Sequence, residues 1–225
     1  MHRSLLVFAL PLLALWTRVA RADPSTVSFA VAGWAGEQQA PLDAVNATIR
    51  RDGFSPLPSV RRMAGLDVQA VYSRTRAGVS LGAGRATTKD PREGRELVSW
   101  LSTVGIQAGV DVLRYRTLSV FVSAGIVAGR LSLESSDARL LLLDGRTHDK
   151  AAFGFSALPL EIGTEQLIPV GKASHDEAWV LIFGVRGGWV QQLSGGWDEL
   201  DATAGDLDLS GLRGRLVLGF GAASL

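Results

Sequence analysis

The chain has 225 residues with a formal net charge of only +1, and 47% of its residues are hydrophobic, with 26 glycines in all. It contains no cysteine, which excludes a disulfide framework and a thiolate metal site. The hydrophobic content excludes a disordered chain, and no basic patch indicates a nucleic-acid partner.

Residues 1–22 carry the pattern of an export signal that is removed after transport. Arg3 precedes an apolar run over 5–16, and an Ala-Arg-Ala tripeptide ends at Ala22. A membrane anchor is the alternative, but an apolar run of about a dozen residues is too short to span a bilayer as a helix. We therefore predict cleavage after Ala22 and one mature domain over residues 23–225, slightly acidic because the signal removes arginines and no acid.

The mature chain contains eight segments in which apolar residues alternate with polar residues or glycine. This period of two is typical of a β-strand whose two faces meet different solvents. The segments are 27–35, 65–73, 77–87, 97–113, 118–133, 151–163, 179–189 and 212–222. No later apolar run approaches the roughly 20 residues of a transmembrane helix, so a closed barrel is the way to satisfy the backbone in lipid.

The segment 179–189 shows the pattern most clearly. Trp179, Phe183 and Trp189 share its apolar face, whereas Arg186 lies on the face of the glycines. Ten residues at roughly 3.3 Å each, tilted by about 40°, rise close to the ~25 Å apolar band of an outer-membrane barrel. Tryptophan at both ends of an apolar face predicts that both ends lie at an interface. The interfacial aromatic residues predicted along the chain are Trp100 and Trp189 on the external side and Tyr72 and Trp179 on the periplasmic side.

Two segments depart from the simple pattern. Arg130 has the parity of the lipid-facing residues in segment 118–133, which predicts a bulge or emergence from the membrane near it. Pro159 interrupts segment 151–163, which predicts a bulge or a missing ladder bond.

Long and short connections take turns along the chain, as external loops and periplasmic turns do in outer-membrane barrels. The long connections are 36–64, 88–94, 134–150 and 194–208; 74–76 and 114–117 are short, and 164–177 is intermediate. An even strand count with an exported N-terminus then predicts that both mature ends lie in the periplasm.

The first and third long connections contain structure of their own. Residues 43–52 predict a short helix, with Asp43 as N-cap, Gly53 as a left-handed stop, and Val45 and Ile49 on one apolar side. Such a helix could cover the barrel mouth as a lid, or it could pack as ordinary loop. In the third connection, the apolar run 140–143 precedes an Asp-Gly pair, which predicts a hairpin above the membrane.

With these features the chain resembles the small OmpA/OmpX-type outer-membrane β-barrels, over nearly all of 27–222. The last segment resembles the C-terminal signal that the outer-membrane assembly machinery reads. Its residues are Gly214, Leu216, Leu218 and Phe220, although five residues follow the aromatic one. The resemblance implies an all-β, closed, antiparallel eight-stranded transmembrane barrel with short periplasmic turns and longer external loops. It also implies a bacterial outer-membrane location with lipids, lipopolysaccharide and the assembly machinery as partners.

The charged residues on the inward faces are the first candidate site. They are Asp67, Asp111, Glu161, Arg186, Arg213 and Arg215. A polar conduit is one interpretation, but eight strands enclose just enough space for side chains, which favours a network of ion pairs that fills the interior. An unpaired charge there would cost several kcal/mol, so we expect Arg186 and the final-strand arginines to pair with carboxylates such as Glu161 and Asp111.

Catalytic and metal sites receive little support from the sequence. The mature chain has only His148 and His175, and His148 lies too far along an extended segment from Ser156 to share a hydrogen bond with it, as a lipid A deacylase would need. The acidic residues of 198–208 lack a calcium-loop spacing, although they could meet lipopolysaccharide through divalent cations. We expect no catalytic residue, cofactor or metal, and a non-enzymatic barrel with a structural or surface-binding role through external loops whose ligand is unknown. The alternatives are a narrow pore for small solutes and, less favoured, a lipid A-modifying hydrolase.

Overall fold

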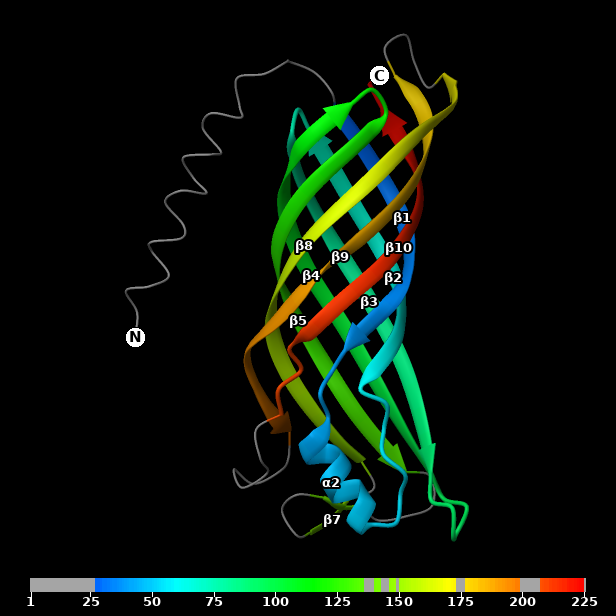
Figure 1. The fold of residues 1–225 in the computed structure, drawn as a ribbon, viewed down its shortest axis with the longest axis vertical. Coiled ribbons are helices and arrows are strands. Elements are labelled where there is room, and N and C mark those ends of the chain that lie inside the picture. The colour runs from blue at the N-terminus through cyan, green and yellow to red at the C-terminus, as the bar shows by residue number, and fades with distance from the viewer. Residues whose placement is uncertain are drawn as a thin grey trace, which may run out of the picture.

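The computed structural model describes residues 27–135, 140–142, 146–148, 150–172, 177–198 and 207–224. The predicted signal 1–22, His175 and the Asp144-Gly145 turn lie outside them. Eight strands close into an antiparallel barrel in the order β1-β10-β9-β8-β5-β4-β3-β2 (Figure 1). Their bounds are β1 Val27–Gln39, β2 Val60–Tyr72, β3 Thr75–Lys89, β4 Glu96–Tyr115, β5 Leu118–Ser135, β8 Lys150–Lys172, β9 Ala178–Asp198 and β10 Gly211–Ala223. The predicted fold class is confirmed.

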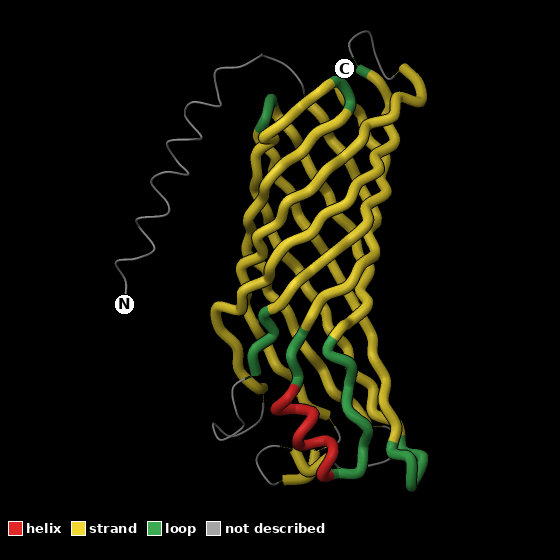
Figure 2. Tube along the Cα trace, viewed as in Figure 1, coloured by secondary structure: helices red, strands yellow, loops and turns green. Residues whose placement is uncertain are grey.

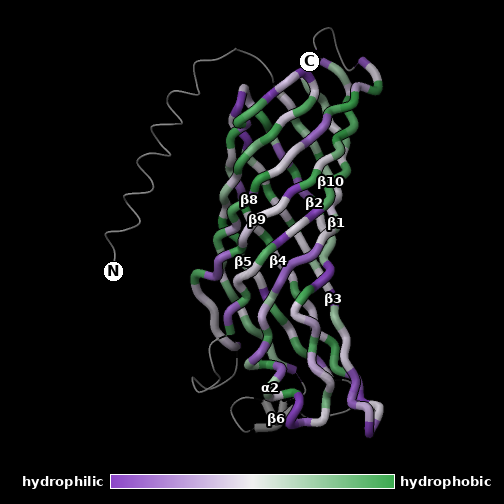
Figure 3. Tube along the Cα trace, viewed as in Figure 1, coloured by the Kyte–Doolittle hydropathy of each residue, from purple (hydrophilic) through white to green (hydrophobic). Residues whose placement is uncertain are grey.

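The outward face of the barrel is an apolar band. Its large side chains come from every strand and are widely exposed, with Ile106 at 63% and Leu218 at 64%. Figure 3 shows hydrophobic residues recurring along the strands around the barrel. Soluble monomers rarely expose apolar patches of more than a few hundred Å², and a closed barrel leaves no strand edge unsatisfied in lipid. The band is therefore a membrane-spanning surface. No helix in the described part of the chain is long and apolar enough to cross a membrane.

The two ends of the barrel differ. Val27 pairs with Tyr72 and Ser28 with Ala223, so the start of β1, the β2–β3 turn and the C-terminus lie at one end, called here the terminal end. The helix α2, Asp43–Arg51, lies at the opposite end, called here the α2 end (Figure 2).

The strands extend beyond the predicted segments, mostly at the α2 end. For example, β2 begins at Val60, and β9 reaches Asp198, so residues predicted as loop lie in paired strands. The ladder between β5 and β8 is interrupted between Ala124/Leu160 and Val127/Ala157, as expected for the proline at position 159.

Arg130 needs no bulge. The register of β4 with β5 shifts only between Asp111 and Leu113, far from Arg130. The Arg130 side chain instead emerges near the α2 end, where it pairs with Asp198 at 2.9 Å. Of the two predicted explanations, the bulge is therefore wrong.

The two structured loops lie together at the α2 end. The predicted helix is confirmed, as is the left-handed stop at Gly53, whose φ is 91°. The prediction of Asp43 as N-cap is wrong, because the cap position is Leu42 and no side chain caps the helix. The predicted hairpin is confirmed: β6, Leu140–Leu142, pairs with β7, Arg146–His148, and β6 contacts α2.

Candidate functional site: the ion-pair network inside the barrel

The interior of the barrel holds a connected set of buried charges. All six residues predicted for the lumen have buried side chains, because strand alternation directs them away from the apolar band. Two further charged residues join them, the carboxylate of Glu165 on β8 and the guanidinium of Arg76 on β3. The network thus connects six of the eight barrel strands.

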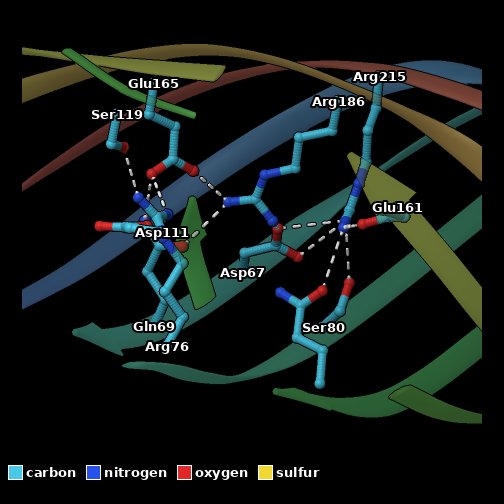
Figure 4. Close-up of polar contacts among 11 residues, drawn as sticks. Asp67, Gln69, Arg76, Ser80, Asp111, Ser119, Glu161, Glu165, Arg186 and Arg215 are labelled. Carbon is cyan, nitrogen blue, oxygen red and sulfur yellow. Dashed lines mark hydrogen bonds and ion pairs between the residues drawn. The ribbon is translucent and has the colours of Figure 1, made fainter. Parts of the chain in front are cut away.

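Asp67 on β2 is the centre of the network. Its Oδ2 accepts hydrogen bonds from Arg186 Nη1 at 2.9 Å and from Arg215 Nη1 at 3.1 Å. Arg215 also donates from Nη2 to Glu161 at 2.5 Å, and Arg213 Nε lies 4.0 Å from Glu161. One carboxylate on β2 therefore joins β9 and β10, which lie beyond the neighbouring strand β1 in the barrel order (Figure 4).

Glu165 extends the network toward the terminal end. Its Oε1 accepts from Arg186 Nη2 at 2.6 Å, and its Oε2 accepts from Arg76. Arg76 also donates to Asp111 and to Ser119, and its guanidinium lies 3.9 Å from the centre of the Phe121 ring. Charge-assisted hydrogen bonds of this kind are the strong ones in a low dielectric.

The spaces that border these charges differ in size. An open depression of about 880 Å³ reaches Arg186, Arg213 and Arg215 and is bordered by exposed residues such as Leu212 and Leu216. Two small cavities, of about 20 Å³ and about 10 Å³, also touch the network. Gln69, Arg76 and Arg186 contribute to their walls. A single water needs roughly 10–15 Å³ of such space, so each of these two cavities has room for about one water.

One of the ion pairs expected from the sequence is present, since Glu161 pairs with Arg215 of the final strand. Other pairs differ from the expected ones. Arg186 bonds to Asp67 and Glu165 rather than to Glu161, and Asp111 bonds to Arg76 rather than to a final-strand arginine. The register explains the first difference, because Arg186 lies level with Gly163 whereas Glu161 lies level with Gly188.

Sequence reasoning misses three interior residues, because their positions fall in predicted connections. Glu165 falls in 164–177, Arg76 in 74–76 and Arg61 in 36–64, yet all three are buried in strands. A signal for two of them is present in the sequence: Glu165 continues the parity of Glu161, and Arg76 that of the inward glycines of β3.

The α2 end of the interior is apolar. One buried cluster joins barrel residues such as Trp34, Leu101 and Phe153 to Val45 and Ile49 of the helix. Trp34 lies at its boundary with the network, since Arg213 and Arg215 lie 4.7 Å and 5.3 Å from its ring. The helix therefore closes this end of the barrel, as the predicted lid would.

Glycine makes room for the Trp34 ring. A Cβ at Gly65 would lie 2.6 Å from the ring, and one at Gly82 would lie 2.7 Å from it. Real Cβ atoms do not approach so closely, so the indole occupies the space that these two inward glycines leave.

The lid segment 40–59 is fastened to the β3–β4 loop. Ser55 N donates to Lys89 O at 3.1 Å, and Arg95 Nη2 donates to Asp52 O at 2.8 Å. Asp90 holds Arg95 in place by accepting from its Nη2 at 2.6 Å. The hydrogen bonds from Arg95 and from the backbone of Arg92 lower the pKa of Asp90.

We expect Asp90→Asn to loosen the lid at neutral pH. A carboxyl whose pKa is lowered by folding stabilises the closed form fully above its unperturbed pKa of about 3.9 and loses this effect as the pH falls through the lowered value. Amide hydrogen exchange over 43–57, corrected for intrinsic rate, should therefore rise in the variant. Glu93→Gln is the control, because Glu93 also contacts Arg95 but is exposed. Equal exchange in both variants would show that Asp90 does not hold the lid.

The predicted interfacial aromatic residues all point outward. Tyr72 and Trp179 lie near the terminal end, and Trp179 stacks on Phe220 at 5.2 Å. Trp100 and Trp189 lie toward the α2 end, where Trp189 Nε1 donates to Gln191. In β10, Leu216, Leu218 and Phe220 are exposed, and Gly214 opens on empty space.

Two of the residues weighed for catalysis, Ser156 and Glu161, do not meet. Ser156 is half-buried and bonds to Ser194 at 2.7 Å, whereas Glu161 points into the lumen. The His148 side chain lies outside the described residues. Within the part of the chain that the structure describes, no group of three or more metal-ligating side chains comes together.

Comparisons with known proteins find similar solved structures at low sequence identity. No protein-family model matches the chain, and no curated protein matches it. The attachment invasion locus protein Ail of Yersinia pestis is 11% identical, with 89% of this chain and 99% of that chain covered and a TM-score of 0.42. A major outer membrane protein from Thermus thermophilus is 15% identical, with 88% and 98% covered and a TM-score of 0.39. OprG from Pseudomonas aeruginosa is 8% identical, with 90% and 96% covered and a TM-score of 0.36.

The closed ring of eight strands and its outward apolar band decide the fold. It is that of a small outer-membrane β-barrel. In this barrel the lumen is filled by ion pairs near one end and by apolar side chains under a lid at the other.

Proposed function

We propose that the protein is a non-enzymatic outer-membrane anchor whose loops at the α2 end support the envelope or bind at the cell surface. The single observation that carries this proposal is the filled interior. The ion pairs around Asp67 and the apolar cluster under α2 occupy the lumen, and the two small cavities beside Arg76 have volumes of only about 20 Å³ and 10 Å³. A barrel without a channel acts through the surfaces that it presents.

The proposed orientation places the terminal end in the periplasm and the α2 end outside. The connections support it, since Ser73 and Arg74 alone join β2 to β3, and Arg116 and Thr117 alone join β4 to β5 at the terminal end. The longer and structured segments, including α2 and the β6–β7 hairpin, lie at the other end. Short turns on the periplasmic side and longer loops outside are typical of such barrels.

The proposed partners follow from this placement. The outward band contacts the lipids, and Trp100 and Trp189 would lie at the external interface beside lipopolysaccharide. Gly214, Leu216, Leu218 and Phe220 on the closing strand are the residues that we propose the assembly machinery reads. Residues 1–22 are the proposed cleaved signal.

Cysteine labelling tests the orientation. The natural chain has no cysteine, so single-cysteine variants give unambiguous sites. We expect a membrane-impermeant maleimide to label Arg50→Cys on intact cells and to label Arg74→Cys only after the outer membrane is permeabilised. Labelling of Arg74→Cys alone on intact cells would reverse the orientation.

Complementation tests the function. Cells without the protein receive either the full chain or a chain in which residues 40–59 are replaced by a short turn. If cells without the protein lose envelope integrity and both chains restore it, the result supports a structural role of the barrel. If these cells lose surface adhesion and only the full chain restores it, the result supports surface binding by the lid segment. Unchanged integrity and adhesion in cells without the protein would reject the proposal.

A further inference from the structure

Arg61 is a buried cation that has no counterion among the residues described by the structure. It lies on β2 opposite Gln38 of β1, and its side chain points into the lumen with 1% exposure. Among the described residues, none of its three guanidinium nitrogens has a hydrogen-bond partner. Its neighbour Arg62 points outward, is 92% exposed and lies 3.7 Å from Glu37.

The surroundings of Arg61 make this arrangement costly. The next inward residue on its strand, Met63, belongs to the apolar cluster that fills the α2 end. Ser99 Oγ, Ser135 Oγ and Trp34 Nε1 in the same part of the barrel also lack partners among the described residues. Buried polar groups normally have partners, and an uncompensated buried charge is destabilising.

The charge balance of the described interior also indicates that Arg61 lacks a negatively charged partner. Five buried arginines lie in the barrel with four buried carboxylates, when the loop residue Asp90 is set aside. The four carboxylates are Asp67, Asp111, Glu161 and Glu165, and each lies within 4.0 Å of an arginine other than Arg61. The part of the interior that the structure describes therefore has one buried cation more than buried carboxylates, and the cation without a carboxylate is Arg61.

We propose that Arg61 is an internal binding site for one anionic group, a carboxylate or a phosphate, beneath the lid segment 40–59. A guanidinium presents a planar fork of donors that matches both groups, and the apolar surroundings strengthen such a pair. The hydroxyls of Ser99 and Ser135, which have no hydrogen-bond partner among the described residues, lie on β4 and β5 toward the same end of the lumen.

Access to the site runs through the lid. Arg61 is enclosed in the structure, and the lid segment joins β1 to β2 directly beside it, with Ala40 N donating to Ser59 O at 2.7 Å. The anion reaches Arg61 when this segment moves. The fastening of the segment by Arg95 and Asp90 then controls how readily the site opens.

The test uses the purified protein folded in zwitterionic detergent, with urea unfolding followed at constant ionic strength. Inorganic phosphate and octanoate are titrated separately into the natural protein, Arg61→Met and Arg62→Met. We expect the unfolding midpoint to rise saturably for the natural protein and for Arg62→Met, because a ligand that binds only the folded state stabilises it. For Arg61→Met the apparent affinity should fall about tenfold or more, as expected for loss of a charged hydrogen bond.

Without added anion, Arg61→Met should be at least as stable as the natural protein, because methionine removes the uncompensated charge. Arg61→Lys keeps the charge without the fork and should retain a weaker response. A response to octanoate alone assigns the site to an acyl carboxylate, and a response to phosphate assigns it to a free anion. The proposal is overturned if neither anion raises the midpoint, if Arg61→Met responds as the natural protein does, or if Arg61→Met is less stable without anion.

Discussion

Replacing Asp67 with alanine should destabilise the folded barrel by about 3–5 kcal/mol, as breaking a buried ion pair by removing one partner does. The effect is large because Asp67 serves two arginines at once. Arg186 and Arg215 would both lose a carboxylate partner in a lumen with almost no space for water. Urea unfolding of the detergent-folded protein measures the change.

The control for this experiment is Asp198→Ala. Asp198 also bonds to an arginine, at 2.9 Å, but both side chains are half exposed or more. Exposed pairs contribute about 1 kcal/mol or less. Equal midpoints for the two variants would mean that the lumen is wet and that the ion pairs do not fill it.

Replacing Trp34 with alanine should cost about 3–5 kcal/mol, as large-to-small changes of a buried aromatic residue do. The ring fills the space between Gly65 and Gly82 and lies beside the cations of Arg213 and Arg215. Its loss would leave a cavity where the apolar cluster meets the network. Unfolding in urea is again the measurement.

Trp100→Ala is the matched control for Trp34→Ala, because Trp100 lies on the outward face and is widely exposed. Its replacement leaves no cavity in the interior, so we expect a clearly smaller loss of stability. A cost for Trp34→Ala no larger than that for Trp100→Ala would show that the indole does not hold the interior together.

The sequence predicts the barrel well because its two faces meet different solvents. In the middle of β4 and β9, valine or leucine alternates with glycine, polar or charged residues, and this parity assigns those side chains to lipid or lumen. Toward the strand ends the inward face is itself apolar, as at Leu101 and Ile182. The helix over 43–51 is predictable for a similar reason, since Val45 and Ile49 share one side and Gly53 ends the helix.

The partners inside the lumen cannot be predicted in the same way. Parity shows that Arg186 and Glu161 point inward, but contacts across a narrow barrel depend on strand tilt and stagger, which no local pattern states. Arg186 therefore meets Asp67 from β2, which is distant in sequence, instead of Glu161 on the neighbouring strand. The ends of the strands are also hard to predict from the sequence. The strands β2 and β8 continue past the apolar band, and the alternation of apolar and polar residues weakens there.

The position of the lid also depends on tertiary packing. An isolated helix of nine residues is marginal in water, which favours ordinary loop packing on local grounds. The apolar cluster under the helix changes the balance, because burial of Val45 and Ile49 against the barrel interior stabilises it. Nothing in residues 43–51 alone indicates that the barrel end beneath them is apolar.

Conductance of the purified protein in a planar lipid bilayer measures whether the lumen is closed. We expect no steady openings for the natural protein, because ion pairs and the lid-covered apolar cluster fill the barrel along its length. Steady openings whose size changes in Arg186→Ala or Arg215→Ala would contradict it, since the current would then pass the network, and the protein would be a narrow pore.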